Sequence, residues 1–183
     1  LTQGSKEVVR AVVSEAARHS RLIDDAQRLR AATLMLVKFA PHPDMPINYG
    51  DEYSRAVLLL SRQGGEAEKE VLRAQLKSES MDLVAAILEE VDRDSLWLRR
   101  EEILPFLNGR YPDDVTGPAI LALARRGTAE DADLIAGYLG HKRLTADAVT
   151  ALGILRATRY APRIRALADD AGVHPLLRAH AVI

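Results

Sequence analysis

Residues 148–155 read Ala-Val-Thr-Ala-Leu-Gly-Ile-Leu, and the apolar positions of this stretch recur at a fixed distance along the chain. Four pairs of identical residues share an offset of 29 positions: Ala119 and Ala148, Leu123 and Leu152, Ala132 and Ala161, and Ile135 and Ile164. A period of about 30 residues has room for two helices and two turns, which is typical of a helical-hairpin solenoid. Because one such hairpin cannot bury its apolar stripe alone, we expect neighbouring hairpins to stack.

The composition agrees with a helical fold. The chain has 183 residues, of which 48% are apolar and only 4% aromatic, and Ala, Leu, Val and Ile make up most of the apolar set. Ala and Leu are the best helix formers, whereas sheets favour β-branched and aromatic residues. No segment alternates apolar and polar residues over the length of a strand. The sequence therefore predicts an all-α fold, an α/α superhelix of stacked antiparallel helical hairpins.

Prolines and glycines divide the chain. The spacing predicts one solenoid domain over residues 1–183, with a helical pair over 1–40, a proline-rich loop over 41–51 and hairpins over 52–183. The predicted helices of the hairpins include residues 54–62, 66–77, 80–91 and 95–107, and Pro105 should kink or end the last of these. The chain begins at Leu1 and ends within an apolar helical pattern, so we expect it to be part of a longer protein.

Turn residues indicate where the later helices begin and end. Five hydroxyl residues are predicted N-caps: Ser80, Ser95, Thr116, Thr128 and Thr145. Pro118 and Pro162 are placed in the first turn of their helices, where a missing N–H costs nothing. Glycines at 127, 140 and 172 fall at predicted helix ends, where the left-handed conformation is needed.

Residues 148–155, followed by Tyr160-Ala161-Pro162-Arg163-Ile164 and by Leu177-Arg178-Ala179, resemble the short HEAT repeat of the phycobilisome-lyase type. The resemblance is clearest over residues 116–183, weaker over 54–107 and absent over 1–50. It implies a right-handed, armadillo-like solenoid that serves as a binding surface, because the motif specifies packing rather than chemistry. Asp147 departs from the pattern, since the family often has Arg at this position.

Charge, cysteine content and motifs argue against several kinds of binding and catalytic site. The net charge is −1 and the pI about 6.6, so there is no bulk attraction to nucleic acid or to an anionic membrane. The absence of Cys excludes disulfides and thiolate ligands and fits a reducing cytoplasm. No apolar run has the length of a transmembrane helix. The five histidines lack ligand spacing, and no phosphate-binding loop or nucleophile motif is present, so we expect no catalytic residue, metal or cofactor.

A row of arginines is the first candidate binding surface. Arg126 and Arg156 lie 30 positions apart in corresponding turns, Arg159 is close to the second, and Arg163 and Arg165 follow on the next helix. Stacking of the hairpins would bring them onto one edge, where they could bind phosphate or an acidic protein. The alternative interpretation, which the sequence favours, is that cations at helix C-termini are stabilised by the macrodipole.

The second candidate is the proline-rich loop, in which Tyr49 is a predicted partner-binding residue, because loops on rigid scaffolds often carry function. The alternative is that the loop is a stiff linker between the helical pair and the hairpins. We also expect weak self-association through the apolar edges that truncated ends would leave.

Three functions remain open. The first is a non-catalytic scaffold or regulatory module that binds a protein partner. The second is a nucleic-acid-binding protein that uses the arginine row. The third is a HEAT-fold enzyme such as a chromophore lyase or a DNA glycosylase, although few aromatic residues are available for the stacking that such pockets use. The sequence favours the first of these.

Overall fold

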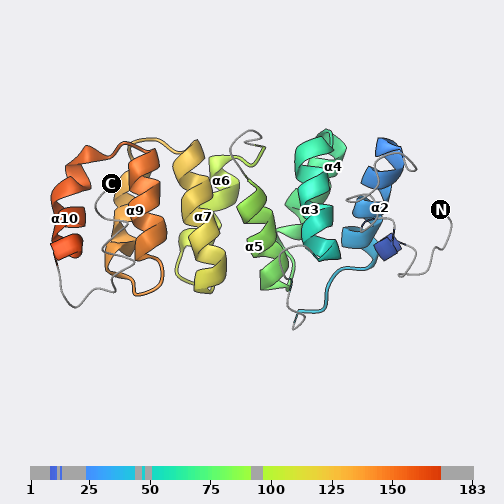
Figure 1. The fold of residues 1–183 in the computed structure, drawn as a ribbon, viewed down its shortest axis with the longest axis horizontal. Coiled ribbons are helices and arrows are strands. Elements are labelled where there is room, and N and C mark those ends of the chain that lie inside the picture. Colours follow the sequence, from blue (N-terminus) through green and yellow to red (C-terminus); the bar gives the residue numbers. More distant parts are fainter. Residues whose placement is uncertain are drawn as a thin grey trace. The chain divides into compact units, whose positions relative to one another are not determined.

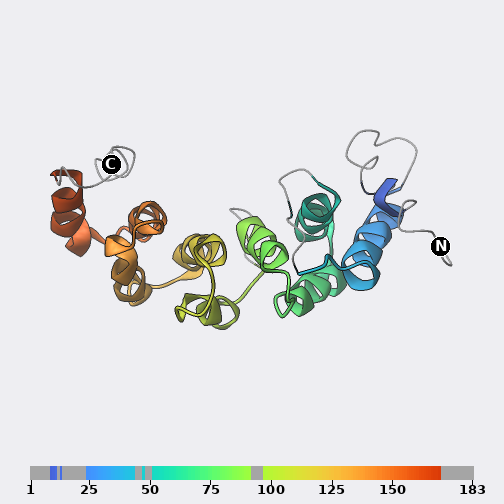
Figure 2. The ribbon, with the colours of Figure 1, turned by 90° about the horizontal axis from the view of Figure 1, so that it is seen from below.

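The structure is a computed structural model that describes residues 9–11, 13, 24–43, 47, 51–91 and 97–169. The described residues contain helices and turns and no strand, which confirms the predicted all-α class. The chain divides into two compact units, Leu1–Val91 and Asp92–Ile183. Figures 1 and 2 show the helices in two views.

The first unit is built around one central helix. Its helices are α2 (Asp25–Lys38), α3 (Glu52–Gln63), α4 (Glu66–Gln75) and α5 (Met81–Glu90). Helix α3 packs against α2, α4 and α5, and Tyr53, Ala56 and Leu60 on it are almost completely buried. The predicted cap Ser80 is confirmed, because its hydroxyl accepts the Leu83 N–H at the start of α5.

The described part of the proline-rich loop is attached to this unit through Ile47, and the chain just before the loop is attached through Phe39. Helix α2 ends at Lys38, before Pro41, as expected from the restriction that proline places on the preceding residue. The Tyr53 hydroxyl donates to the Phe39 carbonyl over 2.9 Å, and the Ile47 N–H donates to the Asp82 carboxylate over 3.0 Å. The loop therefore contacts the first turn of α5, and the end of α2 contacts the first turn of α3.

In the second unit, the longer helices α7 and α9 are each followed by shorter helical elements. Its elements are α6 (Arg100–Ile103), η1 (Leu104–Leu107), α7 (Asp113–Arg126), α8 (Asp131–Ala136), η2 (Gly137–Gly140), α9 (Thr145–Ile154), η3 (Thr158–Tyr160) and α10 (Ala161–Asp169). Helices α7 and α9 lie side by side, and α8 and η2 pack on α9 (Figures 1 and 2). The helix that contains Pro105 changes to 3-10 geometry at Leu104, as its proline predicts.

The repeated apolar positions differ in how deeply their side chains are buried. Ala119 and Leu123 of α7, and Ala148 and Leu152 of α9, are at most 2% exposed and form the core between these two helices. Ala132 and Ile135 of α8 are equally buried. Their partners by sequence, at positions 161 and 164 on α10, are only half-buried. The period thus locates the packing of α7 on α9, and it overstates the burial of α10.

Three of the predicted helix starts are wrong. Helix α6 begins at Arg100 rather than at residue 95, and Ser95 lies outside the described residues. Helix α7 begins at Asp113, so Thr116 and Pro118 lie inside it. The Thr116 hydroxyl donates to the carbonyls of residues 106 and 111 instead of accepting a cap bond. Thr145 behaves in the same way at the start of α9, because its hydroxyl donates to the carbonyls of residues 139 and 141.

The turn after α7 also differs from the prediction. Thr128 does not cap α8; its N–H donates to the carboxylate of Asp131, the first residue of that helix, over 2.8 Å. Gly127 has a φ of −78°, so no left-handed residue closes α7. Among the described residues, positive φ occurs at Gly109 and at Arg156. Gly172, for which the sequence predicts a left-handed conformation at a helix end, lies outside the described residues.

Candidate interaction surface

Two arginines of the predicted row join successive hairpins of the second unit. The Arg126 Nε donates to the Leu98 carbonyl over 2.9 Å, and an Arg159 Nη donates to the Ala129 carbonyl over 3.2 Å. Leu98 lies two residues before the start of α6, and Ala129 lies two residues before the start of α8. The two contacts are therefore equivalent in successive hairpins. The sequence paired Arg126 with Arg156, whereas the contacts pair Arg126 with Arg159.

Arg159 is further engaged by a small polar cluster. Its guanidinium lies 2.8 Å from the Asp133 carboxylate and 5.1 Å from the centroid of the Tyr160 ring. The Tyr160 hydroxyl donates to the same carboxylate. A hydrogen bond with the Tyr160 side chain, together with the charge of Asp133, raises the pKa of Arg159. The cluster fastens η3 to α8, so this cation is already compensated.

An ion pair that the sequence analysis did not single out connects α6 to α8. The Arg100 guanidinium grips the Asp131 carboxylate through its Nε, at 2.9 and 3.0 Å from the two oxygens, and through an Nη at 2.5 Å. Asp131 is 1% exposed. The hydrogen bond from Arg100 holds the pKa of Asp131 below its usual value, and hydrogen bonds from Thr128 act in the same direction. The separation of 31 positions, close to the repeat period, was the available signal.

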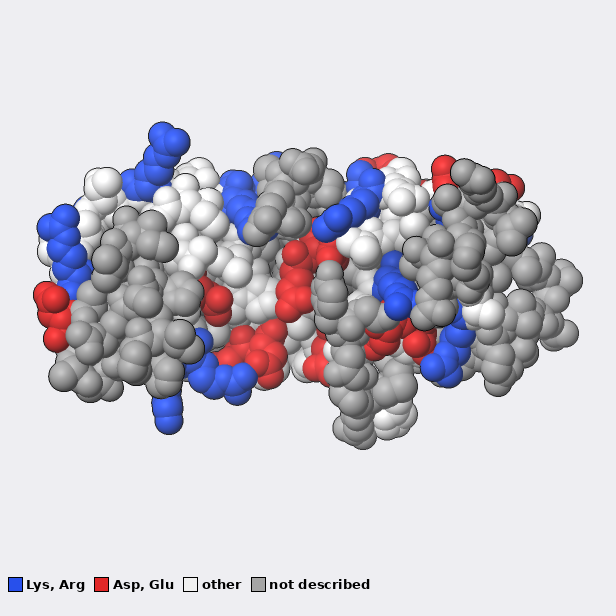
Figure 3. All heavy atoms as spheres, viewed as in Figure 1, with Lys and Arg blue, Asp and Glu red and all other residues white. Residues whose placement is uncertain are grey.

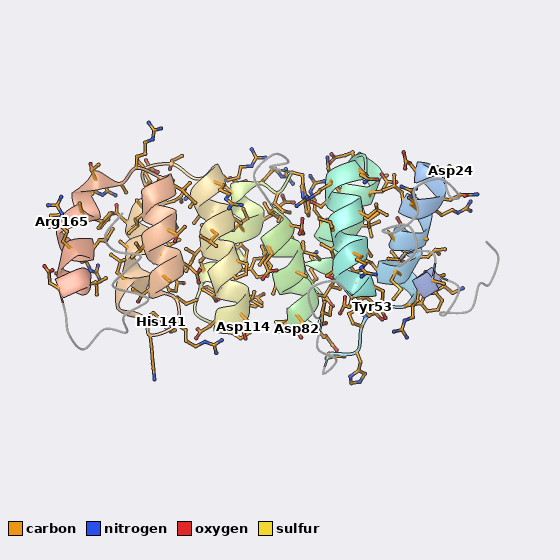
Figure 4. The ribbon with its side chains drawn as sticks, viewed as in Figure 1. Asp24, Tyr53, Asp82, Asp114, His141 and Arg165 are labelled. Carbon is orange, nitrogen blue, oxygen red and sulfur yellow. The ribbon has the colours of Figure 1, made fainter. Side chains whose placement is uncertain are left out.

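A second missed group joins the start of α7 to the turn before α9. Arg143 lies 2.5 Å from the Asp114 carboxylate and 3.6 Å from that of Asp113. The His141 Nε2 lies 3.7 Å from the Asp113 carboxylate. Figure 4 shows Asp114 and His141 at the same end of α7 and α9. These carboxylates also sit in the first turn of α7, where the helix dipole favours negative charge.

Arg156 differs from the arginines that join hairpins. It lies in the turn after α9, is exposed, and has a φ of 51°. Within the described parts of the chain, its side chain makes no hydrogen bond or ion pair. Its guanidinium is therefore available to solvent or to a partner.

Arg163 and Arg165 are exposed on α10, and Figure 4 shows Arg165 pointing away from its helix. Neither makes an ion pair with another described residue. Residues two positions apart on an α-helix diverge by about 200°, so these two arginines lie on opposite flanks of α10 rather than on one face. Tyr49, the candidate in the proline-rich loop, lies outside the described residues.

The described surface carries both signs of charge. On the face shown in Figure 3, acidic and basic side chains are interspersed in each unit. Over the residues that the structure describes, no group of three or more His, Asp or Glu side chains is arranged to hold a metal ion. Within the same residues, no helix has the length and apolar character needed to cross a membrane.

The site thus consists of paired groups inside the second unit and of three outward arginines. Arg126, Arg159 and Arg100 are used in contacts between hairpins, while Arg156, Arg163 and Arg165 face outward. Comparisons of the sequence with protein families and with curated proteins, and of the fold with solved structures, gave no match.

Proposed function

We propose that this chain is a HEAT-like, right-handed α/α solenoid that acts as a non-catalytic module for binding a protein partner. The observation that supports the proposal is the recurrence of one contact in successive hairpins, from Arg126 to the Leu98 carbonyl and from Arg159 to the Ala129 carbonyl. Each contact ties one hairpin to the preceding one, across 28 positions of the sequence for Arg126 and 30 for Arg159. The side chains that point outward remain available for docking.

The charge pattern supports a protein partner over a polyanion. Paired carboxylates and arginines occupy much of the second unit, as in the pairs of Asp131 with Arg100 and of Asp114 with Arg143. Mixed charge with a few outward cations suits electrostatic recognition of one complementary protein surface. It is a weak basis for gripping a phosphate backbone, which needs several uncompensated cations in a row.

The test is reconstitution with a native partner. The purified chain is used to capture proteins from a nuclease-treated extract of the source cells, and each captured protein is then expressed alone and titrated by calorimetry. We expect one protein to bind saturably at a fixed stoichiometry. If no protein is captured from the nuclease-treated extract, or if every captured protein fails to bind when purified, the proposal is wrong.

Nucleic-acid binding is the second candidate, and the outward Arg156, Arg163 and Arg165 are the observation that favours it. If it is correct, affinity for an oligonucleotide falls steeply with salt, and changing these three residues to Ala removes most of that dependence. Lys77→Ala is the matched control, because Lys77 is an exposed cation of the first unit. Arg126 and Arg159 are left intact, since their replacement would also disturb contacts between hairpins.

A further inference from the structure

The end of α9 is closed by a turn that places Arg156 in the left-handed region. The Arg156 N–H donates to the Gly153 carbonyl and the Ala157 N–H donates to the Leu152 carbonyl, each over 3.0 Å. These two bonds and the φ of 51° define a Schellman motif with Arg156 at its left-handed position. Glycine is the usual residue there, because a Cβ is strained in this conformation.

The arginine is therefore not explained by the backbone of the turn. Its contacts do not explain it either, because its side chain has no ion pair or hydrogen bond with the described residues. Arg126 and Arg159, by contrast, each bond a carbonyl of the preceding hairpin. A strained residue whose side chain stabilises nothing nearby is a reason to look for an external role.

Along the chain, Arg156 lies two positions from an exposed apolar residue and within a basic stretch. Ile154 is 41% exposed and is one of three large apolar side chains exposed in the described parts of the chain. A Cβ placed on Gly153 would meet no atom within 4 Å, so the surface beside Ile154 is open. From residue 154 to residue 166 the sequence contains four arginines and no acidic residue.

We propose that Gly153, Ile154 and Arg156 form a docking point for an acidic protein segment in which a carboxylate stands next to an apolar side chain. The guanidinium would bind the carboxylate through two parallel hydrogen bonds, and Ile154 would cover the apolar side chain. The basic stretch around this point would orient the segment by long-range attraction. The inference rests on the proposed function and names the kind of partner that this surface takes.

An acidic peptide fits this docking point better than a nucleic acid does. Phosphate backbones are held by several cations on one face. Arg159 is compensated by Asp133, and Arg163 and Arg165 lie on opposite flanks of α10. One exposed guanidinium, close in sequence to an exposed isoleucine, matches one carboxylate with an apolar neighbour.

The variant Arg156→Gly separates binding from folding. Glycine removes both the guanidinium and the strain of the turn, so we expect the variant to fold and its Tm to rise by about 2–4 °C. Arg156→Lys keeps the positive charge and keeps a side chain at the left-handed backbone position. Lys77→Ala removes an exposed cation from the first unit and is the matched control for charge.

The experiment selects peptides from a displayed library of random dodecapeptides on the immobilised chain. We expect the enriched peptides to carry Asp or Glu beside an apolar residue. The best of them, labelled with a fluorophore, should bind at least tenfold more weakly to Arg156→Gly and with unchanged affinity to Lys77→Ala. Its affinity for Arg156→Lys should fall between these two, because lysine keeps the charge but cannot form the two parallel hydrogen bonds.

Several results would overturn the docking point. These are a library that yields no peptide above background, enriched peptides without acidic residues, and equal affinity for the original chain and Arg156→Gly. Stronger binding of fluorescein-labelled oligothymidylate, lost in Arg156→Gly, would assign the site to nucleic acid instead. Binding of a native protein that is insensitive to Arg156→Gly would leave the proposed function standing and remove only this site.

Discussion

At the scale of single residues, Asp131 has two structural roles in the second unit. Its carboxylate accepts hydrogen bonds from the Arg100 guanidinium of the preceding hairpin and from the Thr128 backbone in its own turn. It is almost completely buried, so every bond that it loses leaves an unsatisfied group. One side chain thereby fixes both a turn and the contact between two hairpins.

We predict that Asp131→Asn lowers the free energy of unfolding at pH 7 by about 1–3 kcal/mol, because the amide cannot replace the charge-assisted bonds to Arg100. Asp133→Asn, which changes an exposed carboxylate two residues away, should cost much less. Urea denaturation of the two variants and the original chain measures both values. Equal midpoints for the two variants would contradict the prediction.

The pKa of Asp131 gives this difference a defined pH dependence. Because its pKa in the folded chain lies below the ordinary value of 3.8, its stabilisation is complete well above that pH and is lost as the pH falls through the folded pKa. The gap between the original chain and Asp131→Asn should therefore be constant from pH 7 to about 5 and should close below pH 3.8. A gap that stays constant in acid would show that the ionised carboxylate is not responsible.

At the scale of elements, the Gly64–Gly65 turn between α3 and α4 holds two glycines with different surroundings. A Cβ on Gly64 would lie 2.4 Å from the Leu60 carbonyl oxygen and 2.5 Å from the Glu68 Cβ. A Cβ on Gly65 would meet only the end of the Glu68 side chain, at 3.4 Å. Only the first glycine is required for the close approach of the two helices.

We predict that Gly64→Ala lowers the free energy of unfolding by about 1–3 kcal/mol through overpacking, while Gly65→Ala changes it by less than about 1 kcal/mol. Chemical denaturation of the two neighbouring variants provides the comparison, with each variant serving as a control for the other. The assignment of the close contact would be wrong if Gly65→Ala proved the more harmful change.

The packing of α7 on α9 yields a second prediction at this scale. Leu152 is 2% exposed between the two helices, whereas Ile164 on α10 is half-buried. Leu152→Ala should cost roughly 2–5 kcal/mol because it opens a cavity, and Ile164→Ala should cost less than half as much. Thermal or urea unfolding of the two variants measures both costs. Similar losses of stability would mean that Ile164 on α10 is as deeply packed as Leu152 on α9.

The elements also show what the sequence could and could not predict. The helical class, the end of α2 before Pro41 and the packed positions of α7 and α9 follow from periodicity and from proline chemistry. The start of α7 was missed because Asp113, rather than Thr116, opens the helix, and a threonine hydroxyl can donate to a carbonyl as readily as it can cap.

The candidate site was predicted only as a set of cations. Sequence spacing placed Arg126 and Arg156 in equivalent turns, yet the positions that make equivalent contacts are Arg126 and Arg159. Periodicity does not reveal a shift of three residues within a turn, and the turn after α9 has a left-handed residue at Arg156 where the turn after α7 has none. The direction in which each guanidinium points is likewise set by local packing.

At the scale of the whole molecule, burial is distributed unevenly. In the second unit, α7 and α9 carry most of the fully buried side chains, while none of the described side chains of α10 is fully buried. Regions with few buried apolar contacts open at low free energy. The described structure of this unit should therefore open first at α10.

We predict that amide hydrogen exchange, followed by mass spectrometry, is slowest in α7 and α9 and fastest in α10 among the helices of the second unit. Leu152→Ala should accelerate exchange in both α7 and α9, because they share one core. Exchange in α10 as slow as that in α7 would contradict the prediction and would indicate that this helix is held by contacts outside the described residues.

The bonds of Arg126 and Arg159 to backbone carbonyls of the preceding hairpin have an evolutionary consequence. Since the acceptor is a main-chain oxygen, its chemistry is the same whatever side chain that position carries. A gene segment encoding one complete hairpin can therefore be duplicated or lost, and an arginine at the equivalent position still meets a main-chain carbonyl. Insertion of part of a hairpin would move the arginine away from its carbonyl, so descendants of this protein should differ in length by whole hairpins.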